Sequence, residues 1–378
     1  RPRILGVFMP LPAVLTILRT IKDRASISRT DLQQLTGLSW GTVTNTTRDL
    51  LARRLIREEG ATATKAGRKP VRLALNRLTH AIIGLHLAPD HLRLVALNIT
   101  GETLAAESLP FDGSSPHDLL RLVAERLKAI RATEALAGRT LLGLGAALPG
   151  ALDPADGVLI TAPNLPAWKQ IPVRSVLHAA TGLPVRIERL ANCLALAERW
   201  FGNDRPEQDA DAHAGGALGT SGEENLLCLH LDHDIDLGVI LAGKVFHGSS
   251  ALAGDIAHLP LLPHAASCPA CHQRGCLTSL ASQEDPTALG DGVELLTRML
   301  VALFDPDALI LTGRLPARHP VLHECAAKGV RAARLLGHNA QLLAPAVRLD
   351  APAIGACGLV LDAAFDAVAL PNSAVLTA

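Results

Sequence analysis

Three cysteines lie within nine residues in the stretch CPACHQRGC, at positions 268, 271 and 276. Thiols at this spacing can bind a metal ion, carry out redox chemistry or remain free. Structural Zn²⁺ takes four sulfur or nitrogen ligands, so three thiolates require one more, and His264 and His272 are nearby candidates. A redox role for Cys268 and Cys271 is disfavoured because no thioredoxin-like strand and helix surround them. The stretch therefore predicts a structural metal site, with free thiols as the alternative.

A polar helix face in the stretch SWGTVTNTTRDL, which begins at Ser39, offers a second kind of chemistry. Thr and Asn side chains can hydrogen-bond to base edges or phosphates, and arginines pair with phosphates. The basic loop KAGRKP at residues 65–70 suits an adjacent minor groove. The candidate DNA-binding residues are Ser39, Trp40, Thr42, Thr44, Asn45, Arg48, Lys65, Arg68 and Lys69.

The elements around this face follow the pattern of a winged helix-turn-helix. Ser28 can cap a short helix that ends at Gly37 and should turn Leu35 inward. Ser39 can cap the next helix. The alternating VRLAL at residues 71–75 then predicts the second strand of a two-stranded wing. In such a unit the second helix enters the major groove of DNA.

Charge is divided unevenly along the 378 residues. Residues 1–80 hold 15 Lys/Arg against 5 Asp/Glu, a net charge of +10, whereas the remaining 21 basic and 31 acidic residues give −10. This division favours a module that binds a polyanion, attached to a larger domain that avoids one. The seven, mostly scattered cysteines argue against a secreted disulfide framework. No apolar run approaches the roughly 18–20 residues of a membrane span. We therefore expect a cytoplasmic protein without a membrane partner.

Beyond residue 80, apolar strands alternate with longer helices. The strand candidates are AIIGLHL, HLRLVALNI, LLGLGAAL, LPVRIER, NLLCLHLD and VILAG. The helix candidates are HDLLRLVAERLKAI, ANCLALAERW and VELLTRMLVALF. This alternation predicts an α/β fold with ligands at strand ends or between lobes. The polar, Gly/Ala-rich residues 203–224 read as a loop.

Several stretches together resemble the ROK family of repressors, open reading frames and kinases. The matching stretches are the hairpin at 83–104, APNLPAW at 162–168 (sugar loop), IERLANCLALAE at 187–198 (catalytic stretch), LAGDIAH at 252–258, CPACHQRGC at 268–276 and FDPDALILTG at 304–313 (late strand). They follow one another in the family's order and span nearly the whole chain.

The resemblance implies a winged helix-turn-helix in residues 1–80, followed by an actin-like, sugar-kinase-like α/β domain of two lobes. The first lobe would be residues 81–190, rejoined by a C-terminal helix at 359–378. The second, residues 191–358, would carry the metal loop and an oligomerisation surface. The resemblance also nominates His258 to complete the ligand set with Cys268, Cys271 and Cys276, giving one structural Zn²⁺ per chain.

The residues with which ROK kinases transfer a phosphoryl group are replaced here. HLAPD at 86–90 replaces the family's Asp and Gly-Gly-Thr turn. DHDID at 232–236 replaces the family's second, glycine-rich phosphate turn. Proline lacks an N–H donor, and carboxylates repel phosphates. Leu190 takes the place of the catalytic Asp and cannot accept a proton. We therefore predict no kinase activity and no catalytic residue.

The family's sugar site is only partly retained. The resemblance gives Asn164, Arg189, Asp255 and His258 as the effector-binding set, but Arg189, Leu190 and Thr278 replace polar contacts of the family. Losing several hydrogen bonds weakens binding of a standard hexose. Either the effector is unusual, with Arg189 pairing with an acidic or phosphorylated ligand, or the site no longer binds one.

Together these patterns predict a sequence-specific DNA-binding transcriptional regulator, a repressor with a catalytically inactive kinase-like domain that senses a sugar, a sugar phosphate or another small effector. Its partner would be double-stranded DNA with a pseudo-palindromic operator, bound by a homodimer or homotetramer. One alternative is an active ROK-type sugar kinase with a DNA-binding appendage. Another is a regulator controlled by a protein partner, with no small-molecule effector.

Overall fold

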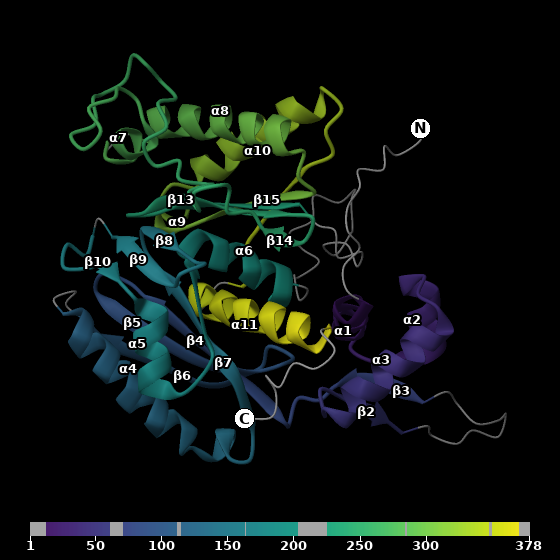
Figure 1. Cartoon of the computed structure of the whole chain (residues 1–378). Helices are drawn as coiled ribbons and strands as arrows, with labels where there is room; N and C mark the ends of the chain where they lie inside the picture. The colour runs from purple at the N-terminus through teal and green to yellow at the C-terminus, as the bar shows by residue number, and fades with distance from the viewer. Residues whose placement is uncertain are drawn as a thin grey trace.

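A computed structural model describes residues 13–60, 71–111, 115–162, 164–202, 225–283, 286–347 and 350–369. It consists of a small N-terminal head beside two stacked α/β bodies (Figure 1). Lys65, Arg68 and Lys69, like the predicted loop at 203–224, lie outside the described residues, so what was expected of them stays a prediction. No helix in the described ranges is long and apolar enough to cross a membrane.

The head has the predicted winged helix-turn-helix architecture. Its three strands form an antiparallel sheet in the order β1-β3-β2, which makes the wing. Its elements are α1 (Ala13–Asp23), β1 (Ile27–Ser28), α2 (Arg29–Thr36), α3 (Trp40–Ala52), β2 (Ile56–Glu59) and β3 (Arg72–Leu75).

Both predicted caps of the helix-turn-helix are present. The Oγ atom of Ser28 accepts a hydrogen bond from the N–H of Asp31 at 3.1 Å, which satisfies a free donor at the start of α2. Gly37 ends α2 with φ +67°, a left-handed conformation that favours glycine. The Oγ atom of Ser39 caps α3 in the same way, 3.1 Å from the N–H of Thr42.

The prediction that Leu35 faces inward is wrong. Its side chain is 53% exposed, whereas Leu32, one turn earlier, is fully buried. Because α2 has only eight residues, its central turn reaches the core of the head and its last turn does not. The 3.6-residue period placed both leucines on one face of the helix. It could not show how much of that face other elements of the head cover.

The first body is built on a five-stranded sheet in the order β11-β7-β4-β5-β6. Strand β7 pairs in parallel with β4 and β11, and the other neighbours are antiparallel. A second sheet, β10-β9-β8, lies beside it. The elements are β4 (His80–Leu87), β5 (His91–Asn98), β6 (Thr103–Pro110), α4 (Pro116–Arg131), η1 (Glu134–Leu136), β7 (Thr140–Leu148), β8 (Ala151–Asp153), β9 (Val158–Thr161), β10 (Lys169–Ile171), α5 (Val173–Thr181) and β11 (Val185–Arg189).

The second body is built on the sheet β14-β13-β12-β15-β16, covered on its outer face by α8 and α10 (Figure 1). Strand β15 is parallel to both neighbours, whereas β13 is antiparallel. The elements are β12 (Leu226–Leu231), β13 (Ile235–Leu241), β14 (Lys244–Val245), α7 (Leu277–Ala281), α8 (Thr287–Phe304), β15 (Ala308–Thr312), α9 (Arg314–Arg318), α10 (Val321–Arg334) and β16 (Gln341–Leu343).

Two helices, α6 (Leu190–Phe201) and α11 (Ala351–Ala369), run between the two sheets (Figure 1). Glycines on the first sheet let α11 approach closely: a Cβ atom on Gly84 would lie 1.9 Å from the carbonyl oxygen of Ala353, and one on Gly145 would lie 1.8 Å from that of Ala356. Gly145 therefore serves helix packing.

Helix α11 begins earlier than predicted, at Ala351 and not at residue 359. Proline at its second position is tolerated because the first turn of a helix has no N–H partner to lose. The helix packs across β7 and β4 and against α6. The division of the chain at residues 80, 190 and 358 stays a prediction.

Candidate functional site

Helix α3 presents the predicted DNA-binding residues that lie among the described ones. Trp40, Asn45 and Arg48 are exposed on it, and Thr42 and Thr44 are half-buried. The Ser39 hydroxyl is engaged in capping and lies 2.8 Å from Oγ1 of Thr42. The face that remains open on the first turns of α3 is thus a mixture of indole, amide and guanidinium groups. These groups can reach base edges and phosphates.

Four potential metal ligands converge on the loop before α7. The Nδ1 atom of His258 lies 3.8 Å from Sγ of both Cys268 and Cys276, and the sulfurs of Cys271 and Cys276 are 3.8 Å apart. All four ligand atoms lie within 4.8 Å of one another. Three sulfurs and one imidazole nitrogen at these separations fit a tetrahedral metal ion.

The backbone of this loop explains why the four groups meet. Bridges from Pro260 to Cys276 and from Ser267 to Arg274 close it into a short knuckle. Gly275 has φ +62°, and a Cβ atom there would lie 1.8 Å from the carbonyl oxygen of Leu262. The knuckle thereby brings the segment of His258 against the cysteines. His264 and His272 are not among the four converging residues.

The pKa values of two of these cysteines shift in opposite directions: desolvation raises that of Cys271, whereas that of Cys268 is lowered. A hydrogen bond from the backbone of Cys271 is the main cause that lowers the pKa of Cys268 to about 6. Metal ions bind thiolates and not thiols, so a lowered pKa suits a ligand cysteine. This part of the chain can hold a metal ion.

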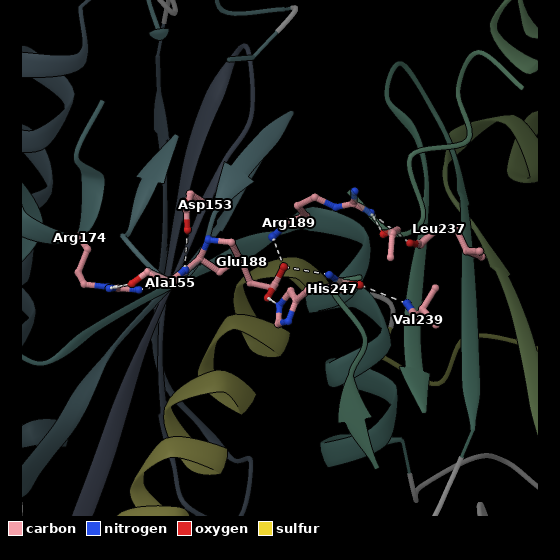
Figure 2. Close-up of polar contacts among 11 residues, drawn as sticks. Asp153, Ala155, Arg174, Glu188, Arg189, Leu237, Val239 and His247 are labelled. Atoms are coloured by element: carbon pink, nitrogen blue, oxygen red, sulfur yellow. Dashed lines mark hydrogen bonds and ion pairs between the residues drawn. The ribbon is translucent and has the colours of Figure 1, made fainter. Parts of the chain in front are cut away.

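Glu188 is the centre of a polar network between the two bodies, which Figure 2 shows. Its Oε1 atom accepts hydrogen bonds from the N–H of Arg189 (2.8 Å) and the amide of Asn192 (2.9 Å), and Oε2 lies 2.6 Å from Nε2 of His247. Asn192 in turn accepts from the N–H of Val239 at 3.1 Å. The buried carboxylate thus ties the end of β11 and the start of α6 to β13 and to the loop after β14.

The hydrogen bond from Glu188 raises the pKa of His247. Sequence reasoning missed both residues. The available signal was a carboxylate at the end of the strand candidate LPVRIER, because a charge that ends a buried strand needs a partner.

Arg189 is buried and already has partners. Its Nη2 atom donates to Oδ1 of Asp236 at 2.8 Å and to the carbonyl oxygen of Ala253 at 2.8 Å, and in Figure 2 its guanidinium reaches towards Leu237. Burial raises the pKa of Asp236 to about 7 despite the nearby guanidinium. The acidic partner of Arg189 in this structure is therefore a side chain of the protein itself.

Asn164 is engaged in the same way. Its Nδ2 atom donates to Oδ1 of Asp234 at 2.5 Å, and burial raises the pKa of Asp234. Of the remaining effector residues, Asp255 is exposed and His258 belongs to the cysteine cluster. The structure therefore commits three of the four predicted effector residues to partners within the chain.

The stretches predicted to replace the kinase groups lie at the ends of β4 and β12 and at the start of α6. Leu190 is the first residue of α6 and is half-buried. Desolvation lowers the pKa of His86, at the end of β4, to about 3 and that of His230, at the end of β12, to about 4. His86 Nε2 and His230 Nδ1 are buried without a hydrogen-bond partner among the described residues. Burial thus favours the neutral form of both imidazoles, to which the sequence assigned no role.

Comparison with known proteins agrees with this architecture. The chain is 31% identical to the xylose repressor of Caldicellulosiruptor bescii over 71% of its own length and 63% of that protein's length. It is 24% identical to the xylose repressor of Bacillus spizizenii over 93% of its length and 95% of that protein's. The alignment with the first of these relatives thus spans less than two thirds of that relative.

A solved structure shows the same fold. It is a ROK family transcriptional regulator described as a homologue of the Escherichia coli Mlc protein, with a TM-score of 0.72 and 20% identity, and the match covers 94% of this chain and 98% of that one. The sequence model of the ROK family matches residues 82–287, more than half of the chain. The chain belongs to the ROK family.

Proposed function

We propose that the chain is a sequence-specific DNA-binding transcriptional regulator that acts as a repressor. The observation that carries this proposal is the capped helix-turn-helix with its wing, whose helix α3 turns a polar and basic face to solvent. This head holds an excess of positive charge, whereas the rest of the chain is acidic. Two relatives named xylose repressor support the same function.

In this proposal the first turns of α3 lie in the major groove. Asn45 would hydrogen-bond to base edges, Thr42 and Thr44 would meet thymine methyl groups with their own methyls, and Ser39 and Trp40 would fix the entry of the helix. Arg48 would contact a phosphate, which gives salt-dependent affinity. The basic loop with Lys65, Arg68 and Lys69 would follow the adjacent minor groove.

We further propose that the kinase-like bodies do not transfer phosphate. The support is the absence of a proton acceptor at Leu190 and the carboxylates of the turn at residues 232–236. An active sugar kinase would release ADP when supplied with ATP and D-glucose or D-xylose. The proposal predicts no release above the rate without protein.

A structural Zn²⁺ is the metal that suits the four converging ligands. The Cys268, Cys271, Cys276 and His258 set fills a tetrahedron with protein ligands and leaves no position for substrate. When bound, the ion would stabilise the loop before α7 and perform no chemistry.

A sugar or sugar phosphate is the proposed effector, and D-xylose is the first to test because of the names of the relatives. It would bind at Asn164, Arg189, Asp255 and His258. Control by a protein partner is the alternative, and it predicts no thermal shift with sugars and a stable partner in a pull-down.

We also propose that the chain acts as a homodimer or homotetramer in the cytoplasm. Leu295, Met299 and Leu303 repeat every four residues along α8 and are exposed, Leu303 by 72%. An exposed apolar stripe of this kind supports self-association. A two-fold dimer would match a pseudo-palindromic operator.

The direct test is selection of genomic fragments. Full-length protein would be incubated with sheared DNA of its own genome at moderate salt, and the retained fragments would be sequenced. We expect a small set of fragments that share a pseudo-palindromic sequence. Retention of fragments in proportion to their abundance in the input would contradict the proposal.

A further inference from the structure

The segment of residues 232–236 (the acidic turn) comprises the turn between β12 and β13 and the first two residues of β13, and it carries a carboxylate at every second position. Each of its three aspartates has a partner: Asp232 binds Nε of Arg314 at 2.7 Å, Asp234 binds Asn164 at 2.5 Å, and Asp236 binds Arg189 at 2.8 Å. Arg314 belongs to the second body, as the acidic turn does. Asn164 and Arg189 belong to the first body, so two of the three contacts join the bodies.

The aspartates of the two joining contacts are half-buried, whereas Asn164 is exposed. Burial raises the pKa of both Asp234 and Asp236, and the nearby charges of Asp255 and Asp234 raise that of Asp236 further. A carboxylate that loses its hydration requires hydrogen-bond donors in exchange. Within the described residues those donors are the amide of Asn164 for Asp234, and the guanidinium of Arg189 with the N–H of Leu237 for Asp236.

The packing around Arg189 leaves it little freedom. A Cβ atom on Gly254 would lie 2.8 Å from Nη2 of Arg189 and 1.9 Å from the carbonyl oxygen of Leu237. The guanidinium therefore lies directly against the glycine that precedes Asp255. Asp236 and the carbonyl oxygen of Ala253 already accept hydrogen bonds from this guanidinium.

We infer that the acidic turn is an intramolecular latch: Asp234 and Asp236 hold the two bodies together by occupying Asn164 and Arg189, the donors that a ligand would otherwise use. The latch goes beyond the proposed regulator function. If the effector binds at these residues, it must displace the latch. The free energy needed to break both contacts then reduces the net free energy of effector binding and weakens its affinity.

Hydrogen–deuterium exchange of the full-length protein, without DNA or sugar, tests the latch. The variants are Asp234→Ala, Asp236→Asn and the double variant. We expect amide exchange in the hairpin of β9 and β10, which carries Asn164, to accelerate at least threefold in the double variant, because the contact that restrains it is lost. Asp232→Asn is the matched control, since its partner Arg314 lies in the same body, and its hairpin should exchange at the wild-type rate.

Unchanged exchange in the double variant, or equal acceleration in Asp232→Asn, would overturn the inference. Should the double variant fail to fold, Asn164→Ala tests the same contact from the first body. It should accelerate exchange in the acidic turn, and a wild-type rate there would equally overturn the latch. Because neither DNA nor effector is present, a negative result would leave the proposed repressor function intact.

Discussion

At the scale of single residues, the metal cluster shows what spacing reveals and what it leaves open. The separation of Cys268, Cys271 and Cys276 predicted a metal loop directly. The fourth ligand could not be chosen from spacing, because His264 and His272 are nearer in sequence than His258. The bridge from Pro260 to Cys276 brings His258 in, and no local pattern encodes such a long-range pairing.

Replacing one of the ligands should remove the metal. Cys271→Ser should lower zinc content from about one ion per chain towards zero and lower the melting temperature by several degrees, because the free energy of metal binding contributes to folding. Elemental analysis and a thermal melt of the purified protein measure both. His264→Ala is the control and should keep its zinc. Wild-type protein without zinc, or equal loss in the control, would contradict the assignment.

The buried histidines predict a pH dependence. The pKa values of His86 and His230 are about 3 and 4 in the folded chain, below the unfolded value of 6.5. Below pH 6.5 the unfolded chain therefore binds more protons, so their contribution to stability is complete above pH 6.5 and is lost as pH falls towards 4. The loss is at most about 1.4 kcal/mol per pH unit for each histidine.

Urea unfolding between pH 7 and pH 4.5 measures this dependence. The raised pKa of Asp236, about 7, acts in the opposite direction, since its contribution is lost as pH rises. The comparison is therefore between variants. His86→Gln and His230→Gln should each lose stability less steeply than the wild type as the pH falls, and parallel curves would show that these histidines do not titrate in this way.

At the scale of elements, the helix-turn-helix was predictable because local signals set it. Side-chain caps, a glycine stop and strand alternation are all encoded within a few residues. The docking of the head was not predictable. Arg19 on α1 and Arg199 on α6 both bind Asp362 on α11, each at 3.2 Å, although Arg19 and Asp362 are 343 positions apart. The head thus rests on the same helices that run between the two sheets.

Two substitutions can distinguish the role of Ser39 in capping α3 from its proposed role in DNA binding. Ser39→Ala should lower the free energy of unfolding by about 1 kcal/mol, because it removes the acceptor for the N–H of Thr42. Ser39→Asp keeps a capping oxygen and should retain stability, but its charge should weaken DNA binding by repelling phosphates. Urea unfolding and a gel shift measure the two effects. Equal loss of stability in both variants would show that capping is not the role of this side chain.

At the scale of the whole molecule, the alternation of strands and helices and the order of the motifs predicted the two α/β bodies. Contacts between the bodies could not be predicted in the same way. Arg189 looked available to a ligand because its partner Asp236 lies 47 positions further along, in the other body. Similarly, the family resemblance indicated a C-terminal helix but not its start at Ala351, since small residues and proline obscure the helical period there.

The division of charge between the basic head and the acidic bodies should also affect how the whole molecule binds DNA. The acidic bodies should be repelled by DNA, so that only the head lies close to phosphates. Affinity should therefore fall with salt according to the number of phosphates that the head contacts.

The most direct test of the central claim, that the head reads DNA through α3, is the affinity of full-length protein for a selected genomic fragment across a salt series. Fluorescence anisotropy would compare Arg48→Ala with Arg121→Ala, which replaces another exposed arginine, on α4 of the first body. The account predicts that Arg48→Ala weakens binding about tenfold and reduces the salt slope by about one, whereas Arg121→Ala binds as the wild type does. Equal affinity of Arg48→Ala and the wild type, or wild-type binding no tighter than to a random duplex, would contradict it.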